Sequence, residues 1–230
     1  MSGGDARVVL VHGAWADGSS WSKVIVGLRS NRIDAVTAPL PLTTLAEDVA
    51  SLDRTLERLE GPVVLAGHAY AGAVIASTRD PKVKALVYIA ALAPAEGETV
   101  ADVFYRNAAH PNAPKLAPDN HGLIWLPHDA FAEAFAQNAS AEEQAVLAAV
   151  QRPISPACIS VPVGRPLWKD VPSWYLLAGQ DRMIVADTQR FMAERMKARV
   201  NAHPVDHTPS VTAPDLVVDL IRTAARELRG

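Results

Sequence analysis

The sequence predicts an α/β protein, with a mostly parallel sheet of about six or more strands flanked by helices. Short apolar runs alternate along the chain with stretches of helical periodicity, as they do in successive βαβ units. The clearest run, Val8-Val9-Leu10-Val11, is apolar at odd and even positions alike, which is typical of a strand covered on both faces. With 230 residues, 49% of them hydrophobic, the chain is long enough to bury a sizeable core.

The predicted strands share three features. Each is short, is rich in apolar residues except for the last, and is followed by a change to turn-forming or helical sequence. They cover residues 8–11, 33–37, 63–66, 83–90, 173–177 and 199–203.

Helical patterns fill the intervals between these strands. Thr44 and Glu47 have the spacing of a capping box, and the helix that they open carries one apolar stripe from residue 45 to residue 59. A second helix is predicted over 188–197. Near the C-terminus, Pro214 suits a first helical turn, and apolar residues then recur with a 3.6-residue period.

Residues 94–171 interrupt the alternation. They contain no convincing core strand, and prolines 111, 114 and 118 predict irregular structure in the first half. Amphipathic helices are plausible at 128–137 and 141–151. An insertion of this length is too large for a simple loop. We therefore predict a helical cap or lid over 94–171, on an α/β core formed by 1–93 and 172–230.

Composition limits the partners and the compartment. A net charge of −3 gives no electrostatic reason to expect nucleic acid or an anionic membrane surface. No apolar run approaches the ~20 residues of a membrane span, and residues 1–5 lack the basic region of a secretory signal. The lone cysteine, Cys158, cannot form an internal disulfide, which fits a reducing compartment. We expect a cytoplasmic protein with a small-molecule substrate or ligand; a homodimer stays open.

The segment Gly67-His68-Ala69-Tyr70-Ala71-Gly72 stands where a serine hydrolase carries Gly-X-Ser-X-Gly. A β-branched run precedes it and a small-residue helical pattern follows. Strand, sharp turn and helix are the context that a nucleophile elbow requires. The residue at the apex is Ala69, which has no hydroxyl. The sequence thus has the frame of a catalytic turn without its reacting atom.

Further candidates follow other predicted strands. Asp181 comes after the strand at 173–177, and His207 comes after the strand at 199–203, in the order acid and then histidine. Ala14, just after the first strand, and Tyr70, just after the apex, would offer backbone N–H groups to an oxyanion. The side chains of Ala69, Asp181 and His207 are therefore expected to converge.

These motifs resemble those of the α/β-hydrolase superfamily, nearest to a compact bacterial esterase-like branch related to plant methylesterases and hydroxynitrile lyases. Such proteins carry Val-His-Gly-Ala-Trp, Gly-His-Ser-Tyr-Gly-Gly, Gly-X-Asp-X-X-Ile and a final His-X-Pro. The matching segments here are 11–15, 67–72, 179–184 and 207–209. The resemblance implies an ester-hydrolase lineage in which Ala69 occupies the nucleophile position and Ala71 replaces a glycine.

Other residues have both a functional and a packing interpretation. Asp181 could be a plain turn residue, and Asp206 is a rival acid, although neighbours on an extended segment point apart. Pocket-lining aromatic residues are predicted at Trp15, Trp125, Phe131 and Phe135, where simple packing is the alternative. No metal site is expected, because the histidines form no His-X₃-His pair. No cofactor is expected either, since the first strand is not followed by Gly-X-Gly-X-X-Gly.

Three hypotheses explain Ala69. It is an engineered serine replacement in a carboxylic-ester hydrolase, or it is natural and the His207–Asp181 pair acts as a general base without a nucleophile, or the protein binds a small molecule without catalysis. Loss of a serine nucleophile costs roughly 10⁶ in kcat, so conventional ester turnover by this chain is expected to be close to undetectable.

Overall fold

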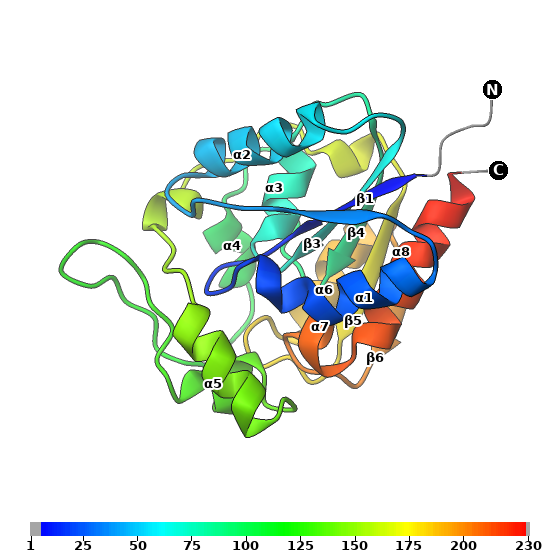
Figure 1. Ribbon diagram of the computed structural model, residues 1–230. Coiled ribbons are helices and arrows are strands. Elements are labelled where there is room, and N and C mark those ends of the chain that lie inside the picture. Colours follow the sequence, from blue (N-terminus) through cyan, green and yellow to red (C-terminus); the bar gives the residue numbers. More distant parts are fainter. Residues whose placement is uncertain (1–5, 229–230) are drawn as a thin grey trace.

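The six predicted strands form one parallel sheet in a computed structural model that describes residues 6–228 (Figure 1). The strand order is β2-β1-β3-β4-β5-β6. The strands are β1 (Arg7–Val11), β2 (Ala35–Ala38), β3 (Val63–His68), β4 (Val83–Ile89), β5 (Ser173–Ala178) and β6 (Arg199–His203). The predicted fold class is thereby confirmed. Residues 1–5, on which the prediction about a secretory signal rested, lie outside the described part.

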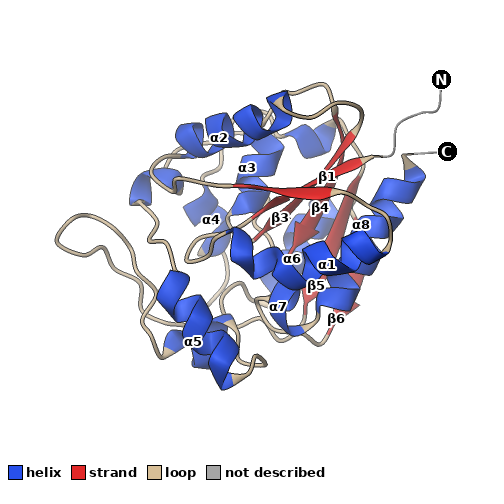
Figure 2. Cartoon of the chain, in the orientation of Figure 1, coloured by secondary structure: helices blue, strands red, loops and turns tan. Residues whose placement is uncertain are grey.

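Helices cover both faces of the sheet, as the apolar character of both sets of strand positions predicted (Figure 2). Val8 and Leu10 of β1 pack with α1 (Ser22–Ser30) and α8 (Pro214–Glu227). Val9 and Val11 belong to the core on the other face, with α2 (Leu45–Glu57), α3 (Ala71–Ser77) and α6 (Ala186–Arg195). Because successive side chains of a strand point to opposite faces, each strand contributes to two separate cores.

The predicted helix starts agree with the capping chemistry. The Thr44 hydroxyl accepts the N–H of Glu47 at 3.1 Å, and α2 begins at the next residue. Pro214 opens α8. A short α7 (Pro209–Thr212) and a 3₁₀ turn, η1 (Gly18–Trp21), complete the layer on that face.

Residues 94–171 contain mostly short elements. These are α4 (Val100–Phe104), a π-helical turn η2 (Phe131–Phe135), α5 (Ala141–Val150), and the 3₁₀ turns η3 (Pro156–Cys158) and η4 (Leu167–Lys169). The helix predicted at 128–137 is therefore reduced to one turn. Its last carbonyl, that of Phe135, accepts the Thr208 hydroxyl at 2.6 Å, and Ala136 leaves the helical conformation. A tertiary hydrogen bond to this carbonyl takes the place of the next hydrogen bond of the helix.

The strand order creates a crevice. The chain leaves β1 toward β2 on one side of the sheet, whereas β3 continues toward β4 on the other. The connections after β1 and β3 therefore diverge at the carboxyl edge, and ligands in open α/β sheets bind at such a switch point. The segments that carry Ala14 and Ala69 follow β1 and β3, so they flank this crevice.

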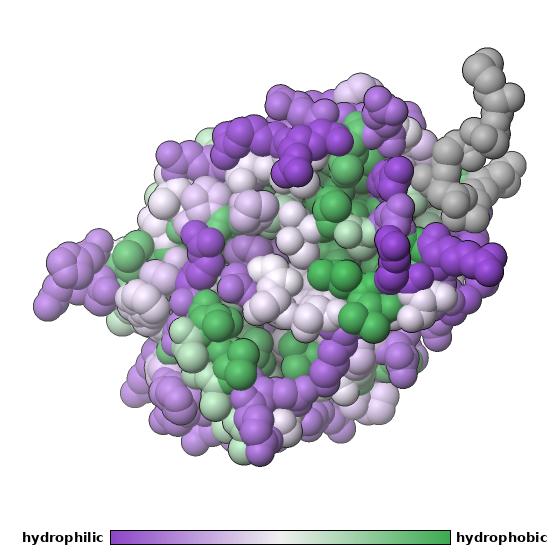
Figure 3. Space-filling model, in the orientation of Figure 1, coloured by the Kyte–Doolittle hydropathy of each residue, from purple (hydrophilic) through white to green (hydrophobic). Residues whose placement is uncertain are grey.

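The surface in Figure 3 mixes polar residues with small apolar patches. The exposed large apolar side chains of the described residues are Val26, Val36, Tyr105, Trp125, Val146, Val161 and Val200. Within residues 6–228, we find no helix with both the length and the apolarity needed to cross a bilayer.

Candidate active site

The turn after β3 has the backbone strain of an elbow. Ala69 has φ +50°, in the left-handed region, which costs an L-residue about 1–3 kcal/mol. Its N–H donates to the Ile89 carbonyl at 3.3 Å, and its own carbonyl accepts N–H groups from Gly72 at 3.1 Å and Leu92 at 2.9 Å. The neighbouring strand connection therefore holds the turn in a conformation that alanine does not favour.

Two glycines allow the chain to approach this turn. A Cβ at Gly72 would lie 2.2 Å from the Leu92 carbonyl oxygen. A Cβ at Gly13 would lie 2.9 Å from the His68 carbonyl oxygen and 3.0 Å from the Ala69 Cβ. The loop after β1 thus packs directly against the elbow.

His207 and Asp181 lie together, buried, at the ends of β6 and β5. The Nδ1–H of His207 donates to Asp181 Oδ2 at 2.8 Å. Gln189 Nε2 donates to the same oxygen at 2.8 Å, while the N–H groups of Met183 and Ile184 donate to Oδ1 at 2.7 and 2.9 Å. Because Nδ1 carries the proton in this arrangement, Nε2 of a neutral His207 is the free acceptor.

Two further histidines, His12 and His68, are buried around these loops. His12 accepts the Leu40 N–H on Nε2 at 3.0 Å, so its Nδ1–H donates to the Gly13 carbonyl. His68 donates from Nε2 to the carbonyl of His207 at 2.7 Å. Burial and then the neighbouring His207 lower the pKa of His68 to about 3, and burial lowers the pKa of His12. Both imidazoles are therefore neutral supports of the site.

The loop after β1, which packs against the elbow at Gly13, and the residue after Ala69 each contribute a backbone amide here. Within residues 6–228, the N–H groups of Ala14 and Tyr70 have no hydrogen-bond acceptor. The adjacent Trp15 is anchored through its N–H to the Arg152 carbonyl at 3.0 Å and through Nε1 to the Ile124 carbonyl at 2.9 Å. Residues 94–171 thus fix the loop that presents the Ala14 amide.

A buried cluster under Tyr70 was not predicted. Asp48 is fully buried and accepts the Leu42 N–H at 2.7 Å, the Tyr70 hydroxyl at 2.7 Å and the Cys158 thiol at 3.6 Å. Burial raises the pKa values of the Asp48 carboxyl and the Tyr70 phenol, and that of Cys158 to about 12. The sequence did contain one indication of this cluster. Asp48 lies four residues before Leu52, so it falls on the apolar stripe of α2, where a carboxylate needs buried partners.

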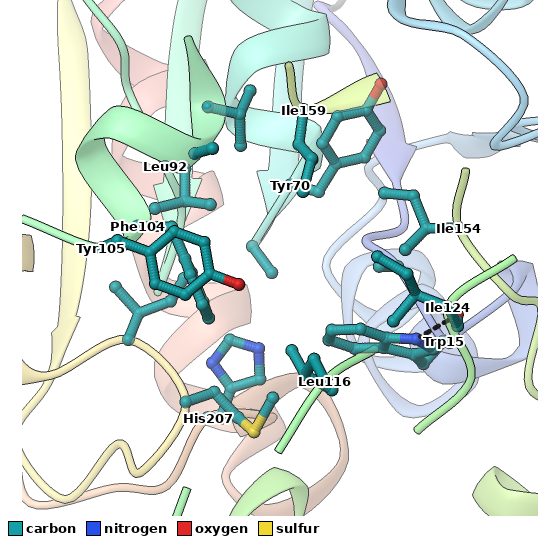
Figure 4. A pocket seen from close by; sticks show the side chains of 16 residues that line it. Trp15, Tyr70, Leu92, Phe104, Tyr105, Leu116, Ile124, Ile154, Ile159 and His207 are labelled. Atoms are coloured by element: carbon teal, nitrogen blue, oxygen red, sulfur yellow. Dashed lines mark hydrogen bonds between the residues drawn. The ribbon is translucent and has the colours of Figure 1, made fainter. Parts of the chain in front are cut away.

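An almost wholly apolar pocket of about 600 Å³, including space at its mouth, opens onto the Ala69 methyl (Figure 4). Sixteen side chains line it: Ala14, Trp15, Ala69, Tyr70, Leu92, Val100, Ala101, Phe104, Tyr105, Leu116, Ile124, Ile154, Ile159, Met183, Ile184 and His207. The structure therefore places Ala69 and His207 on one cavity, with Asp181 hydrogen-bonded behind the histidine.

Three of the four aromatic residues predicted to line the pocket lie elsewhere. Trp125 is 46% exposed, and its indole donates to Asp119. Phe131 and Phe135 are buried in the core; the Phe135 ring packs 5.3 Å from that of His207, behind the cavity wall. Of the four, Trp15 lines the pocket. Aliphatic residues from α4 and from several separate loops supply most of the wall, and these carry no local sequence pattern.

Comparisons with known proteins identify the family to which this fold and site belong. A profile of the alpha/beta hydrolase family matches residues 8–220. The chain belongs to this family. Alpha/beta hydrolase nvfD of Aspergillus novofumigatus is 22% identical over 245 residues, with 96% of each chain covered.

Solved structures of this fold are similar over nearly the whole chain. A pyrethroid hydrolase from Sphingobium faniae has a TM-score of 0.79 at 20% identity, covering 96% of this chain and 97% of that one. A polyneuridine aldehyde esterase variant has 0.81 at 18%, covering 95% and 99%. A tomato methylketone synthase I variant complexed with β-ketoheptanoate has 0.82 at 17%, covering 97% and 99%. At these identities the likeness shows the fold.

Asp206, the rival acid in the sequence, does not bond to the His207 ring and has a structural role instead. Its carboxylate accepts the N–H of Asn138 at 3.0 Å and the hydroxyl of Thr212 at 2.6 Å. These contacts tie residues 94–171 to the turn that carries His207. No group of three or more histidine, cysteine, aspartate or glutamate side chains within 6–228 is placed to hold a metal ion.

Proposed function

We propose that this alpha/beta hydrolase is an enzyme without a nucleophile, in which His207 removes a proton from a small apolar carbonyl compound. One observation carries the proposal. Among the sixteen residues that line the pocket, His207 alone offers an imidazole nitrogen, Nε2, that can accept a proton, and the lining contains no serine, threonine or cysteine. A general base is thus available and a nucleophile is not.

Each part of the site has a role in this reaction. A C–H bond beside the substrate carbonyl breaks, its proton passes to His207 Nε2, and its electron pair delocalises onto the carbonyl oxygen. The N–H groups of Ala14 and Tyr70 donate to that oxygen as it becomes negative. Asp181, bound to Nδ1–H at 2.8 Å, stabilises the imidazolium that forms. Residues 94–171 act as a cap that keeps water from the bound carbonyl.

Deuterium exchange tests the proposal without knowledge of the natural substrate. We expect the protein to catalyse the incorporation of deuterium from D₂O next to the carbonyl of 2-octanone, followed by NMR. His207→Ala should lower the enzyme-dependent rate by about 10²–10⁴-fold, the usual contribution of a general base. The matched control is His128→Ala, because His128 is exposed and lies outside the pocket lining. Equal rates for His207→Ala and the parent would contradict the proposal.

An ester-hydrolase frame is the second candidate, favoured by the retained strain at Ala69 and the two free amides. Here Ala69→Ser should restore hydrolysis of 4-nitrophenyl acetate by at least about 10²-fold, because the new hydroxyl would face His207. No gain in ester hydrolysis would contradict this second candidate.

Binding without catalysis is the remaining alternative. It predicts that a ligand binds equally well to the parent, His207→Ala and Asp181→Asn proteins while no exchange or hydrolysis is measured. Any His207-dependent exchange would exclude it.

A further inference from the structure

A second cavity borders the pocket. This outer chamber, of about 780 Å³ including space open to solvent, is lined by Phe104, Tyr105, Asn107, Ala108, Ala109, Ala113, Pro114, Lys115, Leu116, Met183 and Val185. Four of these side chains, Phe104, Tyr105, Leu116 and Met183, also line the pocket. These four residues border both cavities, and we call them the neck.

The wall of the outer chamber is suited to an apolar chain. Beyond the neck it consists mainly of alanine, proline and valine side chains. Two polar side chains line it: that of Asn107 is engaged, because its Nδ2 donates to Thr188 Oγ1 at 2.9 Å, and that of Lys115 is exposed to solvent. The chamber therefore offers contact area more than polar recognition.

The neck is held at a defined place relative to the base. The Met183 N–H donates to Asp181 Oδ1 at 2.7 Å, so the neck and the acid share one turn. On the other side, the guanidinium of Arg106 stacks 3.6 Å from the centre of the Phe191 ring. The backbone next to Tyr105 is thus tied to α6.

Tyr105 is exposed to solvent, yet its hydroxyl points into the pocket in Figure 4. The other phenol of the lining differs, because the Tyr70 hydroxyl is occupied by Asp48. An exposed aromatic ring and half-buried Leu116 and Phe104 are costly to hydrate in an empty neck. A chain that runs through the neck would cover them.

We propose that the pocket and the outer chamber together bind one elongated carbonyl compound, with the carbonyl beside His207 and an unbranched apolar chain passing between Tyr105, Leu116 and Met183. This inference rests on the proposed function for the position of the carbonyl. It adds the substrate class: medium-chain or longer aliphatic compounds rather than compact ones that fill the pocket alone.

Chain-length dependence of binding tests this proposal. The probes are 2-hexanone, 2-octanone, 2-decanone and 2-dodecanone, titrated calorimetrically against the intact protein. Each methylene that leaves water should tighten binding by about fourfold, and the gain should continue through the longest probe. Leu116→Trp narrows the neck, so it should abolish the further gain in affinity from 2-hexanone to the longer ketones.

Matched variants make the test decisive. Leu123→Trp adds the same bulk to a partly buried leucine outside both cavities, and it should preserve the full series. Tyr105→Trp enlarges an exposed neck residue without touching the core. In this variant the affinity should stop rising at a shorter ketone than in the parent, and the result does not depend on the folding of Leu116→Trp. The proposal is overturned if affinity stops rising at 2-hexanone in the parent, or if the neck variants retain the full series.

The binding test and the exchange test can fail independently of each other. A parent that binds the series as expected but shows no His207-dependent deuterium exchange would support the two-chamber site and overturn the proposed reaction. His207-dependent exchange with no dependence of affinity on chain length would support the proposed reaction and overturn the two-chamber site.

Discussion

Replacement of Asp181 by asparagine would set four hydrogen-bond donors against an amide that cannot accept them all. Oδ1 accepts the N–H groups of Met183 and Ile184, while Oδ2 accepts Gln189 Nε2 and His207 Nδ1, at 2.7–2.9 Å. Gln189 cannot turn its amide around, because its Oε1 accepts the Ala178 N–H and its Nε2 also donates to the Ile184 carbonyl. All four donors therefore point at a site that needs two acceptor oxygens.

Either orientation of an asparagine leaves two buried donors facing an NH₂ group. Each unsatisfied buried donor costs about 1–3 kcal/mol, so Asp181→Asn should lower the free energy of unfolding by about 2–6 kcal/mol. If the NH₂ group faces the imidazole, His207 must move its proton to Nε2 and ceases to be a base. The lost charge also leaves the imidazolium without its partner, so the deuterium-exchange rate should fall by about 10²–10⁴-fold.

Urea unfolding and deuterium exchange together measure these effects. Asp187→Asn is the control for stability, since Asp187 is exposed on α6, and it should change the unfolding free energy by no more than about 0.5 kcal/mol. Asp206→Asn is the control for exchange, because Asp206 is buried beside His207 in sequence without bonding to its ring. An Asp181→Asn protein as stable and as active as the parent would refute the reasoning.

Three further perturbations follow from the packing and the pKa shifts. Gly72→Ala should lower the unfolding free energy by about 1–3 kcal/mol in urea, because its Cβ would meet the Leu92 carbonyl at 2.2 Å; an unchanged midpoint would contradict the contact. His68 has a pKa of about 3 in the fold and 6.5 ordinarily, so below pH 6.5 the unfolded chain binds the proton and stability falls by up to roughly 1.4 kcal/mol per unit. His68→Gln, which can still donate to the His207 carbonyl, should flatten this acid slope in urea titrations across that range. Burial raises the pKa of Asp48, so the folded state holds its proton longer and stability falls as pH rises from about 3.8 through the raised pKa. Asp48→Asn should remove that component, and superimposable stability–pH curves would refute it.

Local sequence determined the sheet and the order of the polar candidates along its edge. Short apolar runs rich in β-branched residues, such as Val8 to Val11, form strands here, since both faces of these strands are buried. The residues that follow each run then lie at one edge, because the strands are parallel. Asp181 and His207 could therefore be paired from the sequence, and the structure places them 2.8 Å apart.

The elbow was also readable, for a different reason. Gly67 and Gly72 flank a position whose backbone must turn within one residue, and the glycine at 72 is required by the approach of the Leu92 carbonyl. The identity of the apex residue does not alter this requirement. The turn consequently survives with alanine at position 69 and φ +50°.

Only the tertiary structure decided the pocket wall and the buried supports. Phe135 and Trp125 have similar apolar character in the sequence, yet one is buried behind His207 and the other is exposed. Asp48 lies on an apolar helix stripe, but its partners Tyr70 and Cys158 come from distant segments. Side chains at 94–171 obey no single period, because their positions depend on contacts with loops far away in the chain. The positions of Ala69, Asp181 and His207 therefore followed from local sequence, whereas the shape of the cavity was set by long-range packing.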